Sequence, residues 1–526
     1  MTVPVTVLGT PVPTANLLPA IRRVALGSPL AAEVAVAGGM PHPSPEPGSS
    51  DAPAQEPTLI LDLIPESTRA AGLGALMKGA GAVTRALPIP QPALLVGPGS
   101  SRRLAQAVAA FGHARVLIVT DAMIAKLGLL DGLTQALGEG GAGYAIFDEI
   151  TPDAPIPLIE RGIAAFRDHD CDALVAVGGG SSMDAAKAIA IAAANPRKSL
   201  RSLAGYFKGL RTPMPVYAVP TTAGTGSEVT VAAVIADPER QSKLVIVDTR
   251  IVPRMAALDP QLMTGLPPAI TAATGIDALT HAVESFIGQW ATPYTEGLSL
   301  AAVGMIFANL RTACRDGANL EARETMALAS TYAGMAFTRA NVGYVHAIAH
   351  QFGGRYHTPH GLANAIMLPH VLRFVAPAVE SRLARLAVRA GLGPESERDE
   401  VLAQAFIDGV EALNREIGIP ATLAALREAD IPELAKAALH EAHTGYPVPR
   451  YMTQDECEQM IRRVLPRDQP AAAAPDAAEA PAGKPAARKT AARKAPARKS
   501  PPRKAAAAAT DTAPTAPRKR RAASDA

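Results

Sequence analysis

The first half of the chain alternates short apolar runs with segments of helical period. Residues 114–121 and 173–179 are apolar and rich in β-branched side chains, as expected of strands buried on both faces of a sheet. Segments of helical period lie between such runs, for example at residues 102–111 and from Met183 onward. This alternation predicts βαβ units and a mostly parallel sheet. The expected strands are residues 93–100, 114–121, 144–150, 173–179 and 215–220.

The pattern changes after about Arg254. β-Branched runs disappear, and Ala- and Leu-rich segments with helical period continue to about Pro466. This change predicts a second domain made only of helices, and the alternative is that the α/β domain continues. The expected parts are an N-terminal extension at 1–85, an α/β domain at 86–253, a helical domain at 254–466 and a tail at 467–526.

Composition separates both ends of the chain from its middle. Residues 40–57 are rich in Pro, Ser and Gly, so the N-terminal extension should be partly disordered. The tail combines Ala and Pro with Arg-Lys pairs, which recur every five residues from Arg488 to Lys504. A segment of this composition buries too little apolar surface to offset its chain entropy, and we expect it to be disordered.

Charge is distributed unevenly along the chain. The net charge is +3, but residues 471–526 hold 13 Lys and Arg against 4 Asp and Glu, so the remainder is mildly acidic. The paired basic residues resemble the tails of linker histones, which suggests non-specific contact with the phosphates of DNA or RNA. The alternative is a solvated extension without a function.

The 3 cysteines are far apart and show no CxxC spacing, which argues against a disulfide framework and against a thiolate metal site. The N-terminus lacks the pattern of a secretory signal. We find no run of about 18 uninterrupted apolar residues, the length that a membrane-spanning helix needs. The sequence therefore predicts a cytoplasmic protein without a membrane span.

Glycines follow the expected strand at residues 173–179. The motif GGGSSMDAAK starts at Gly178 and leads into a helix. Glycines let a backbone approach a pyrophosphate, and the first N–H groups of the helix then face its negative charge. The candidate residues are Gly178, Gly179, Gly180 and Ser181. A tight strand-to-helix turn without a ligand is the alternative.

Two further polar features lie at the ends of expected strands. The motif PTTAGTGSE, at residues 220–228, offers hydroxyl and backbone contacts to a nucleotide, although an ordinary polar loop has the same composition. Asp121 could accept a hydrogen bond from the adenosine ribose of NAD, which would favour NAD over NADP, or it could cap the next helix. Ligands of open α/β sheets bind at these strand ends, so the features support each other.

Four of the 11 histidines fall within fifteen positions. His346 and His350 are four apart in a segment of helical period, so they share one face. Asp277 and His281 form a second such pair, and His360 follows in the sequence PHG. One carboxylate with three neutral imidazoles suits Fe²⁺, Zn²⁺, Ni²⁺ or Co²⁺ rather than Ca²⁺ or Mg²⁺. For any one of these histidines, an ordinary core or surface role is the alternative.

The order of four motifs resembles the iron-containing (group III) alcohol dehydrogenase family. GGGSSMDAAK, TTAGTGSE, GIDALTHAVES and VHAIAHQFGGRYHTPHG lie in this order, and the resemblance covers about residues 84–466. It implies a dehydroquinate synthase-like fold, with a parallel-sheet dinucleotide-binding domain, an all-helical domain and a metal between them. It also implies hydride transfer between a small alcohol or aldehyde and NAD, in a homodimer or larger homo-oligomer. Related reductases of the polyol, lactaldehyde or maleylacetate type are the alternative.

The resemblance also assigns roles to individual residues. It implies Fe²⁺, or alternatively Zn²⁺, and NAD rather than NADP. His350 would relay a proton instead of binding the metal, and His357 has no implied role. Asp153 departs from the family, because it stands in PDAP where the family often has PNPT, with the Asn near the nicotinamide half. The implied metal ligands are Asp277, His281, His346 and His360. The implied cofactor contacts are Asp121, Gly178, Gly179, Gly180, Ser181, Thr221, Thr222, Thr225 and Lys243.

Overall fold

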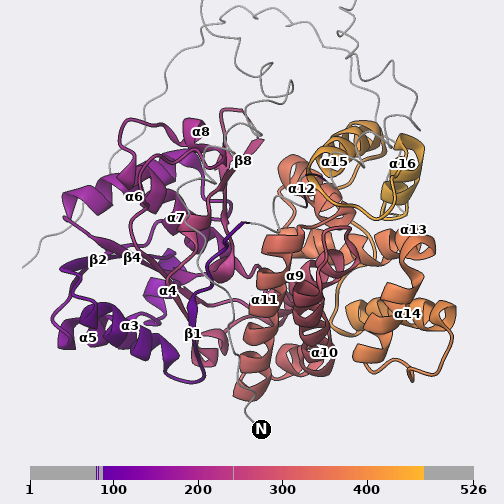
Figure 1. Ribbon diagram of the computed structural model, residues 1–526, viewed down its shortest axis with the longest axis horizontal. Helices are drawn as coiled ribbons and strands as arrows, with labels where there is room; N and C mark the ends of the chain where they lie inside the picture. Colours follow the sequence, from indigo (N-terminus) through magenta and orange to yellow (C-terminus); the bar gives the residue numbers. More distant parts are fainter. Residues whose placement is uncertain (1–78, 80, 82–86, 241, 467–526) are drawn as a thin grey trace, which may run out of the picture. The chain divides into compact units, whose positions relative to one another are not determined.

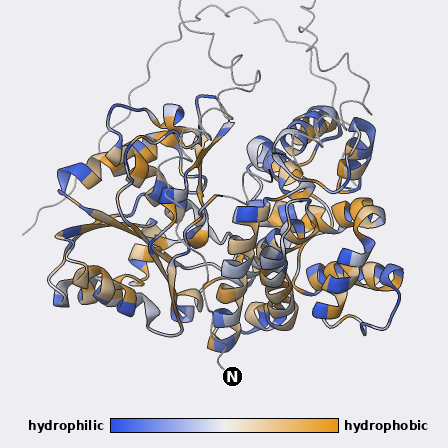
Figure 2. Cartoon of the chain, in the orientation of Figure 1, coloured by the Kyte–Doolittle hydropathy of each residue, from blue (hydrophilic) through white to orange (hydrophobic). Residues whose placement is uncertain are grey.

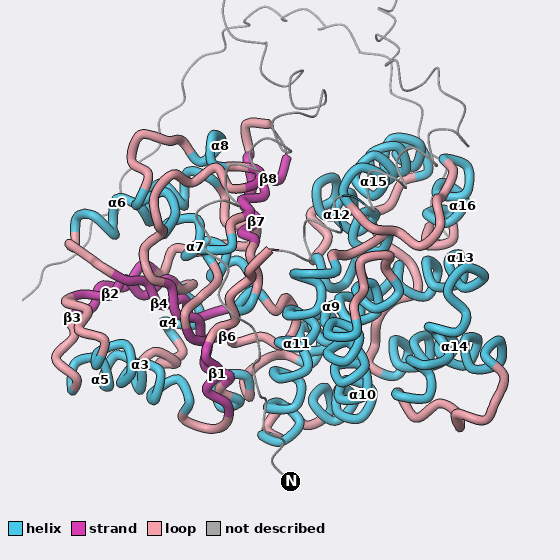
Figure 3. The backbone as a smooth tube through the Cα atoms, in the orientation of Figure 1, coloured by secondary structure: helices cyan, strands magenta, loops and turns pink. Residues whose placement is uncertain are grey.

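The computed structural model describes residues 79, 81, 87–240 and 242–466. The N-terminal extension, apart from Gly79 and Gly81, and the whole basic tail lie outside these residues. Disorder at both ends, and nucleic-acid contact by the tail, therefore stay predictions. Within the described residues, strands occur only in the first half, and the second half is helical (Figures 1 and 3).

The first half is built on a six-stranded sheet in which every strand pair is parallel. The strand order is β1-β9-β6-β4-β2-β3. The strands are β1 (Ala93–Val96), β2 (Arg115–Val119), β3 (Gly143–Phe147), β4 (Ala173–Gly178), β6 (Val216–Pro220) and β9 (Met255–Leu258). Apolar residues dominate these central strands (Figure 2), which is the composition that burial on both faces requires.

Helices cover both faces of this sheet. On β2, Leu117 and Val119 pack in one apolar cluster with α6 and α7, whereas Val116 and Ile118 pack in another with α3 and α5. Successive side chains of a strand point to opposite faces, so the continuous apolar run fills two cores at once. The helices are α3 (Ser100–Ala110), α4 (Ala122–Lys126), α5 (Asp131–Glu139), α6 (Ile156–Asp168), α7 (Gly180–Ala194) and α8 (Leu200–Leu203). The expected parallel sheet with its helices is confirmed.

A second, small sheet stands beside the large one and is not part of the sequence prediction. Its strands are β5 (Gly205–Tyr206), β7 (Ala232–Asp237) and β8 (Ser242–Val247), in the order β5-β8-β7. Strands β7 and β8 pair antiparallel. The sheet carries Lys243, one of the predicted cofactor contacts, on β8.

Strand β9 lies beyond the change of pattern placed at Arg254. Its residues, Met255–Leu258, pair in parallel with β1 and β6, so the sheet ends later than the sequence pattern indicates. The strand reads MAAL and has no β-branched residue, so a short Ala-rich run of this kind cannot be told from a piece of helix. The first long helix begins only at Pro268.

After β9, the described residues of the second half contain helices and no strand. Two short 3-10 turns, Pro260–Met263 and Glu428–Asp430, accompany the α-helices. One buried apolar cluster unites the helices of the second half. The helices are α9 (Pro268–Ile287), α10 (Pro293–Arg315), α11 (Leu320–Ala340), α12 (Tyr344–Tyr356), α13 (His360–Arg389), α14 (Asp399–Glu416), α15 (Ile431–Gly445) and α16 (Gln454–Arg462). The expected helical second domain is thereby confirmed, and it is not a continuation of the α/β pattern.

Two of the described helices, α10 and α13, are long and apolar enough to cross a membrane by length and composition alone. Both supply side chains to the helical core, among them Ile306 of α10 and Leu368 of α13, each fully buried. A core helix is apolar for the same reason as a membrane helix, so these properties do not assign either helix to a membrane.

Candidate metal and cofactor site

The glycine motif forms the turn from β4 into α7. A Cβ on residue 180 would lie 2.7 Å from Cγ2 of Thr225, so only glycine lets the two polar loops come this close. Thr221 donates its backbone N–H to the carbonyl oxygen of Gly178 at 2.9 Å. The motif's last residue, Lys187, is fully buried, and its Nζ donates to Ser227 Oγ at 2.9 Å. The two loops predicted to hold a nucleotide therefore pack directly against each other.

The two loops lie near the point in the sheet where the chain changes the side on which it adds the next strand. Strands β2 and β4 are neighbours, but β2 leads to β3 on one side and β4 leads to β6 on the other. The carboxyl ends of two such strands form the crevice in which doubly wound sheets bind ligands. Asp121 at the end of β2 caps α4, since its Oδ1 accepts from Met123 N at 2.9 Å and Ile124 N at 3.0 Å. Its Oδ2 faces Gly178, so the cap leaves that oxygen available and the ribose contact stays a prediction.

Three further residues gather at the start of α7. The backbone N–H of Asp153 donates to Ser181 Oγ at 3.2 Å. This bond joins the glycine motif to the PDAP turn, whose sequence differs from the PNPT of the family. Lys243 reaches the same turn, because its Nζ donates to Asp153 Oδ1 at 2.8 Å. Ser181 and Lys243 are far apart in the sequence, and in the structure both contact Asp153.

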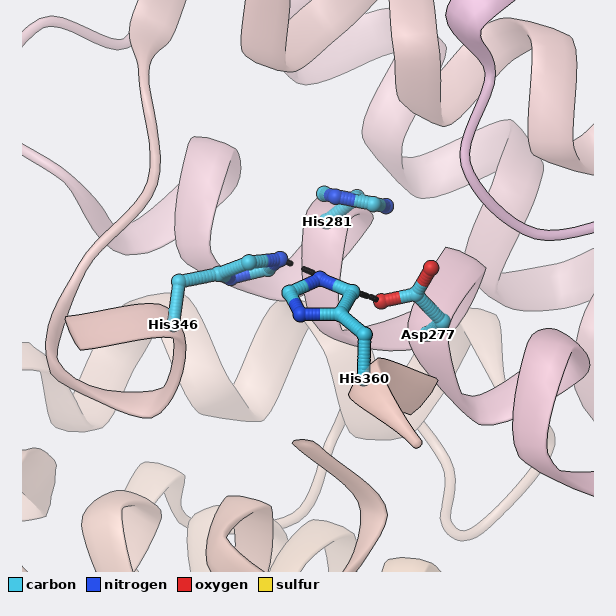
Figure 4. Close-up of side chains that lie close together, drawn as sticks. All are labelled: Asp277, His281, His346 and His360. Atoms are coloured by element: carbon cyan, nitrogen blue, oxygen red, sulfur yellow. Dashed lines mark ion pairs between the residues drawn. The ribbon is translucent and has the colours of Figure 1, made fainter. Parts of the chain in front are cut away.

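Asp277, His281, His346 and His360 come together in the helical half, from helices α9, α12 and α13 (Figure 4). One ligand atom from each lies within 4.8 Å of the others. The Nε2 atoms of His360 and His346 lie 3.4 and 3.9 Å from Asp277 Oδ1. Ligand atoms around a tetrahedral ion with bonds of about 2.1 Å are about 3.4 Å apart. The group thus has the spacing of a metal site.

The approach of α13 to α9 makes this group possible. His360 is the first residue of α13, and Gly361 follows it. A Cβ on residue 361 would lie 2.5 Å from the carbonyl oxygen of Ala273 in α9. Glycine after the histidine therefore lets the start of α13 lie directly on the helix turn that precedes Asp277. This contact accounts for the glycine of the PHG sequence.

The donor set fits a soft-to-borderline divalent cation. Burial lowers the pKa of His281 and, more strongly, of His346, so both imidazoles stay neutral and keep a lone pair at pH 7. The amide Nδ2 of Asn364 lies 2.7 Å from Asp277 Oδ1, 3.1 Å from His360 Nε2 and 3.3 Å from His346 Nε2. An amide has two N–H bonds and cannot satisfy three acceptors. Three lone pairs thus converge on one region, as they would around a cation.

Glu284 of α9 holds the ring of His346. Its Oε2 accepts from Nδ1–H of His346 at 2.6 Å, which leaves Nε2 with the lone pair that faces Asp277. Both side chains are 3% exposed. The backbone N–H groups of Gly343 and Val345 also donate to this carboxylate, at 2.9 and 2.7 Å. A carboxylate that orients a metal-binding imidazole in this way contributes to metal affinity.

Burial raises the pKa of Glu284 to about 7, and a cation on His346 would favour its ionised form. We expect Glu284→Gln to weaken Zn²⁺ binding about 10- to 100-fold, because the amide keeps the size of the side chain but cannot ionise to hold Nδ1–H of His346. The dissociation constant, measured by competition with a chelator on protein of wild-type helix content, checks this. Glu321→Gln, an exposed change of the same chemistry on α11, should leave the constant unchanged. Equal Zn²⁺ affinity of Glu284→Gln and wild type would contradict the role of Glu284.

His350 lies beside the metal group but outside it. Its ring centroid is 5.3 Å from that of His360 and 6.0 Å from that of His346. Its Nδ1 bonds to Glu441 Oε1 of α15 at 2.6 Å, and Tyr446 donates its hydroxyl to the same carboxylate. His350 therefore has a fixed ring plane and a carboxylate behind it, which is the arrangement of a proton-transfer group.

His357, the fourth histidine of the cluster, has a structural position. It is exposed and caps the C-terminus of α12 in the left-handed conformation, with φ 54°. Its backbone N–H donates to the carbonyl oxygen of Gly353 at 3.0 Å. It thus ends the helix and lies outside the metal group.

Three residues around the site were not anticipated from the sequence. Glu284 carried a local signal, since it lies seven residues after Asp277 and three after His281 on one helix face. Asn364 lies one helical turn after His360 and carried the same kind of signal. Glu441 carried none, because it lies 91 residues from His350 and on another helix.

The two halves of the fold meet at the Thr-rich loop, which is the segment PTTAGTGSE at residues 220–228. A Cβ on Gly224 would lie 2.7 Å from Cβ of Thr274, which is on α9 one turn before Asp277. Across the same boundary, Thr331 of α11 donates its hydroxyl to Glu228 Oε1 at 2.7 Å, and both residues are buried. The loop predicted to contact a cofactor is thus packed against the helix that carries half of the metal group.

Comparisons with known proteins agree with this arrangement. Residues 91–260 match the iron-containing alcohol dehydrogenase family, and residues 271–465 match the C-terminal part of the Fe-containing alcohol dehydrogenase family. Lactaldehyde reductase of Escherichia coli K12 is 40% identical over 352 residues, which cover 66% of this chain and 92% of that protein. NAD-dependent methanol dehydrogenase of Bacillus methanolicus is 38% identical over 376 residues, 71% of this chain and 98% of that one.

A solved structure extends the likeness to three dimensions. The crystal structure of 1,3-propanediol oxidoreductase matches with a TM-score of 0.69 and 39% identity, over 72% of this chain and all of that one. The motifs, the fold and both halves of the family match thus lead to one conclusion: this chain belongs to the iron-containing alcohol dehydrogenase family.

Proposed function

We propose that this protein is a metal- and NAD-dependent dehydrogenase, which oxidises small alcohols and reduces the corresponding aldehydes. The observation that carries this proposal is the buried group of Asp277, His281, His346 and His360. One of its helices, α9, packs against the threonine-rich loop, which in turn contacts the glycine motif. Family membership and the names of the relatives, which act on lactaldehyde, methanol and 1,3-propanediol, support the same activity.

The site residues have separate tasks in this proposal. The glycine motif and the first turn of α7 would receive the pyrophosphate, and the Thr-rich loop, through Thr221, Thr222 and Thr225, would bind the rest of the nucleotide. Asp121 would accept from the ribose with the oxygen that the helix cap leaves available. The four-residue metal group would hold Fe²⁺ or Zn²⁺, which when bound supplies Lewis acidity at the substrate oxygen.

The proton needs a route that hydride transfer does not provide. NAD accepts a hydride from the alcohol carbon, so the hydroxyl proton must leave separately. His350 lies beside the metal group, and its Nδ1 is tied to Glu441, so Nε2 is the atom that would accept this proton. Glu441 would stabilise the imidazolium that results. We propose this pair as the exit for the proton.

Several finer points also stay proposals. Iron rather than zinc rests on the family name, and NAD rather than NADP rests on Asp121. A homo-oligomer rests on the resemblance, and a cytoplasmic location is an expectation from the sequence. A reductase of polyols, lactaldehyde or maleylacetate is the alternative on the same fold. The alcohol dehydrogenase and the alternative reductases would share the same hydride transfer and the same role of the metal at the substrate oxygen. Only the identity of the substrate therefore distinguishes these activities.

The full-length protein, loaded with Fe²⁺ or Zn²⁺, should form NADH from at least one member of a panel of methanol, ethanol, 1,2-propanediol, 1,3-propanediol and glycerol. Reduction of the matching aldehydes with NADH and NADPH, and of maleylacetate, separates the alternatives. Chelation of the metal should abolish the activity, and re-addition should restore it. A protein that carries one metal ion per chain and turns over none of these compounds would refute the proposal.

A further inference from the structure

Asp153 is held firmly at the start of α7, in the PDAP turn. It adopts a left-handed backbone conformation with φ 63°. Its N–H donates to Ser181 Oγ at 3.2 Å, and its carbonyl oxygen accepts from Ala236 N of β7 at 2.9 Å. Its carboxylate accepts from Lys243 Nζ at 2.8 Å. The backbone bonds fix the position of Asp153, and its carboxylate forms an ion pair with Lys243.

The cation of this pair reaches toward the metal group. A Cβ on Gly353 of α12 would lie 4.0 Å from Lys243 Nζ. Gly353 follows His346 by seven residues and His350 by three, so all three lie on one face of α12. The Asp153–Lys243 pair thus lies between the glycine motif and the face of α12 that carries His346 and His350.

Charge at this position should matter for the substrate. A substrate whose oxygen lies at the metal group would lie beside the face of α12 that carries His346 and His350, and Lys243 Nζ approaches this face at Gly353. Without a partner, that ammonium would attract a carboxylate or a sulfonate on the substrate. The carboxylate of Asp153, 2.8 Å from Lys243 Nζ, neutralises the positive charge of the ammonium. A neutral amide at this position would leave that charge without a counter-charge. The side chains are 48% and 28% exposed, so the effect is one of net charge rather than of a strong buried bond.

We propose that the Asp153–Lys243 pair makes this site selective for uncharged alcohols and aldehydes over substrates that carry an anionic group. This inference rests on the proposed dehydrogenase function and adds the substrate class. Asp153 acts through Lys243 and is a specificity-determining residue.

The test compares two aldehydes of similar length, butanal and 4-oxobutanoate, with the full-length metal-loaded protein. We expect kcat/KM of the wild type to be at least about tenfold higher for butanal. In Asp153→Asn, which also tolerates the left-handed backbone, the ratio should shift toward 4-oxobutanoate by about fivefold to tenfold. Added salt should reduce this shift, because it screens a partly exposed charge.

Two further variants control the comparison. Asp148→Asn removes an exposed carboxylate five residues away and should leave the ratio unchanged. The double variant Asp153→Asn/Lys243→Met lacks both charges and should return the ratio toward that of the wild type. Both aldehydes use the same cofactor, so an effect on NADH binding cancels in the ratio.

The outcomes separate the two proposals. A wild type that reduces neither these aldehydes nor any other panel member refutes the dehydrogenase function itself. A wild type that reduces both equally well, or an Asp153→Asn variant with an unchanged ratio, refutes the selectivity and leaves the function standing.

Discussion

Replacing Asp277 by alanine should remove the metal and nearly all alcohol oxidation. Asp277 supplies the only carboxylate of the four-residue group, and its Oδ1 lies 3.4 Å from His360 Nε2 and 3.9 Å from His346 Nε2. Without this charge, three neutral imidazoles would have to hold a divalent cation in a buried site. We expect metal content to fall from about one ion per chain to a few per cent, and kcat/KM to fall at least about 1,000-fold.

Elemental analysis of protein purified without chelator, together with NADH formation, checks this prediction. His281→Ala should behave in the same way, whereas Thr274→Ala, one turn earlier on α9 and outside the group, should keep its metal. Circular dichroism establishes that each variant is folded. An Asp277→Ala or His281→Ala protein with full activity and without metal would show that the ligand assignment is wrong.

Replacing His350 by alanine should have a different effect, since we expect the metal to stay and the rate to fall. His350 lies outside the metal group, and its Nδ1 is bound to Glu441 at 2.6 Å. Loss of a positioned proton-transfer group slows catalysis by about 100- to 10,000-fold. The two quantities to measure are the metal content and kcat for the best alcohol of the panel.

The matched control is His357→Asn, which changes an exposed histidine of the same segment. Asparagine tolerates the left-handed conformation that this helix cap requires, so metal content and kcat should equal those of the wild type. If His350→Ala instead lost its metal, His350 would be a ligand. If it kept its full rate, another group would carry the proton.

Local sequence features predicted much of the fold, and the exceptions have physical causes. Strands such as β4 were predictable because continuous apolar, β-branched runs signal burial on both faces. Strand β9 was not, because its four residues, MAAL, carry neither a period nor a propensity that separates strand from helix. It is a strand because β1 and β6 offer it two parallel partners, and such pairing is a property of the whole sheet.

The closeness of the two loops that are predicted to bind the cofactor was predictable for a similar reason. Gly178 and the residues that follow it are contiguous, and the parallel order of strands places this motif and the Thr-rich loop at one edge. The pair of Asp153 with Lys243 was not predictable, because the two residues are 90 positions apart and meet through the separate β7–β8 hairpin. The departure from the family's Asn could be noted in the sequence, but its electrostatic partner could not.

The histidine cluster shows where the sequence alone stops. Spacing by itself determined that His346 and His350 share one helix face, and that Asp277 and His281 share another. The family resemblance assigned His346, and not His350, to the metal group, and the tertiary structure brings His346 together with Asp277, His281 and His360. The Nδ1 atoms of His346 and His350 bind carboxylates that come from different helices, Glu284 at a separation of 62 residues and Glu441 at 91. Helical periodicity sets the direction of a side chain, whereas its partner is set by the packing of distant helices.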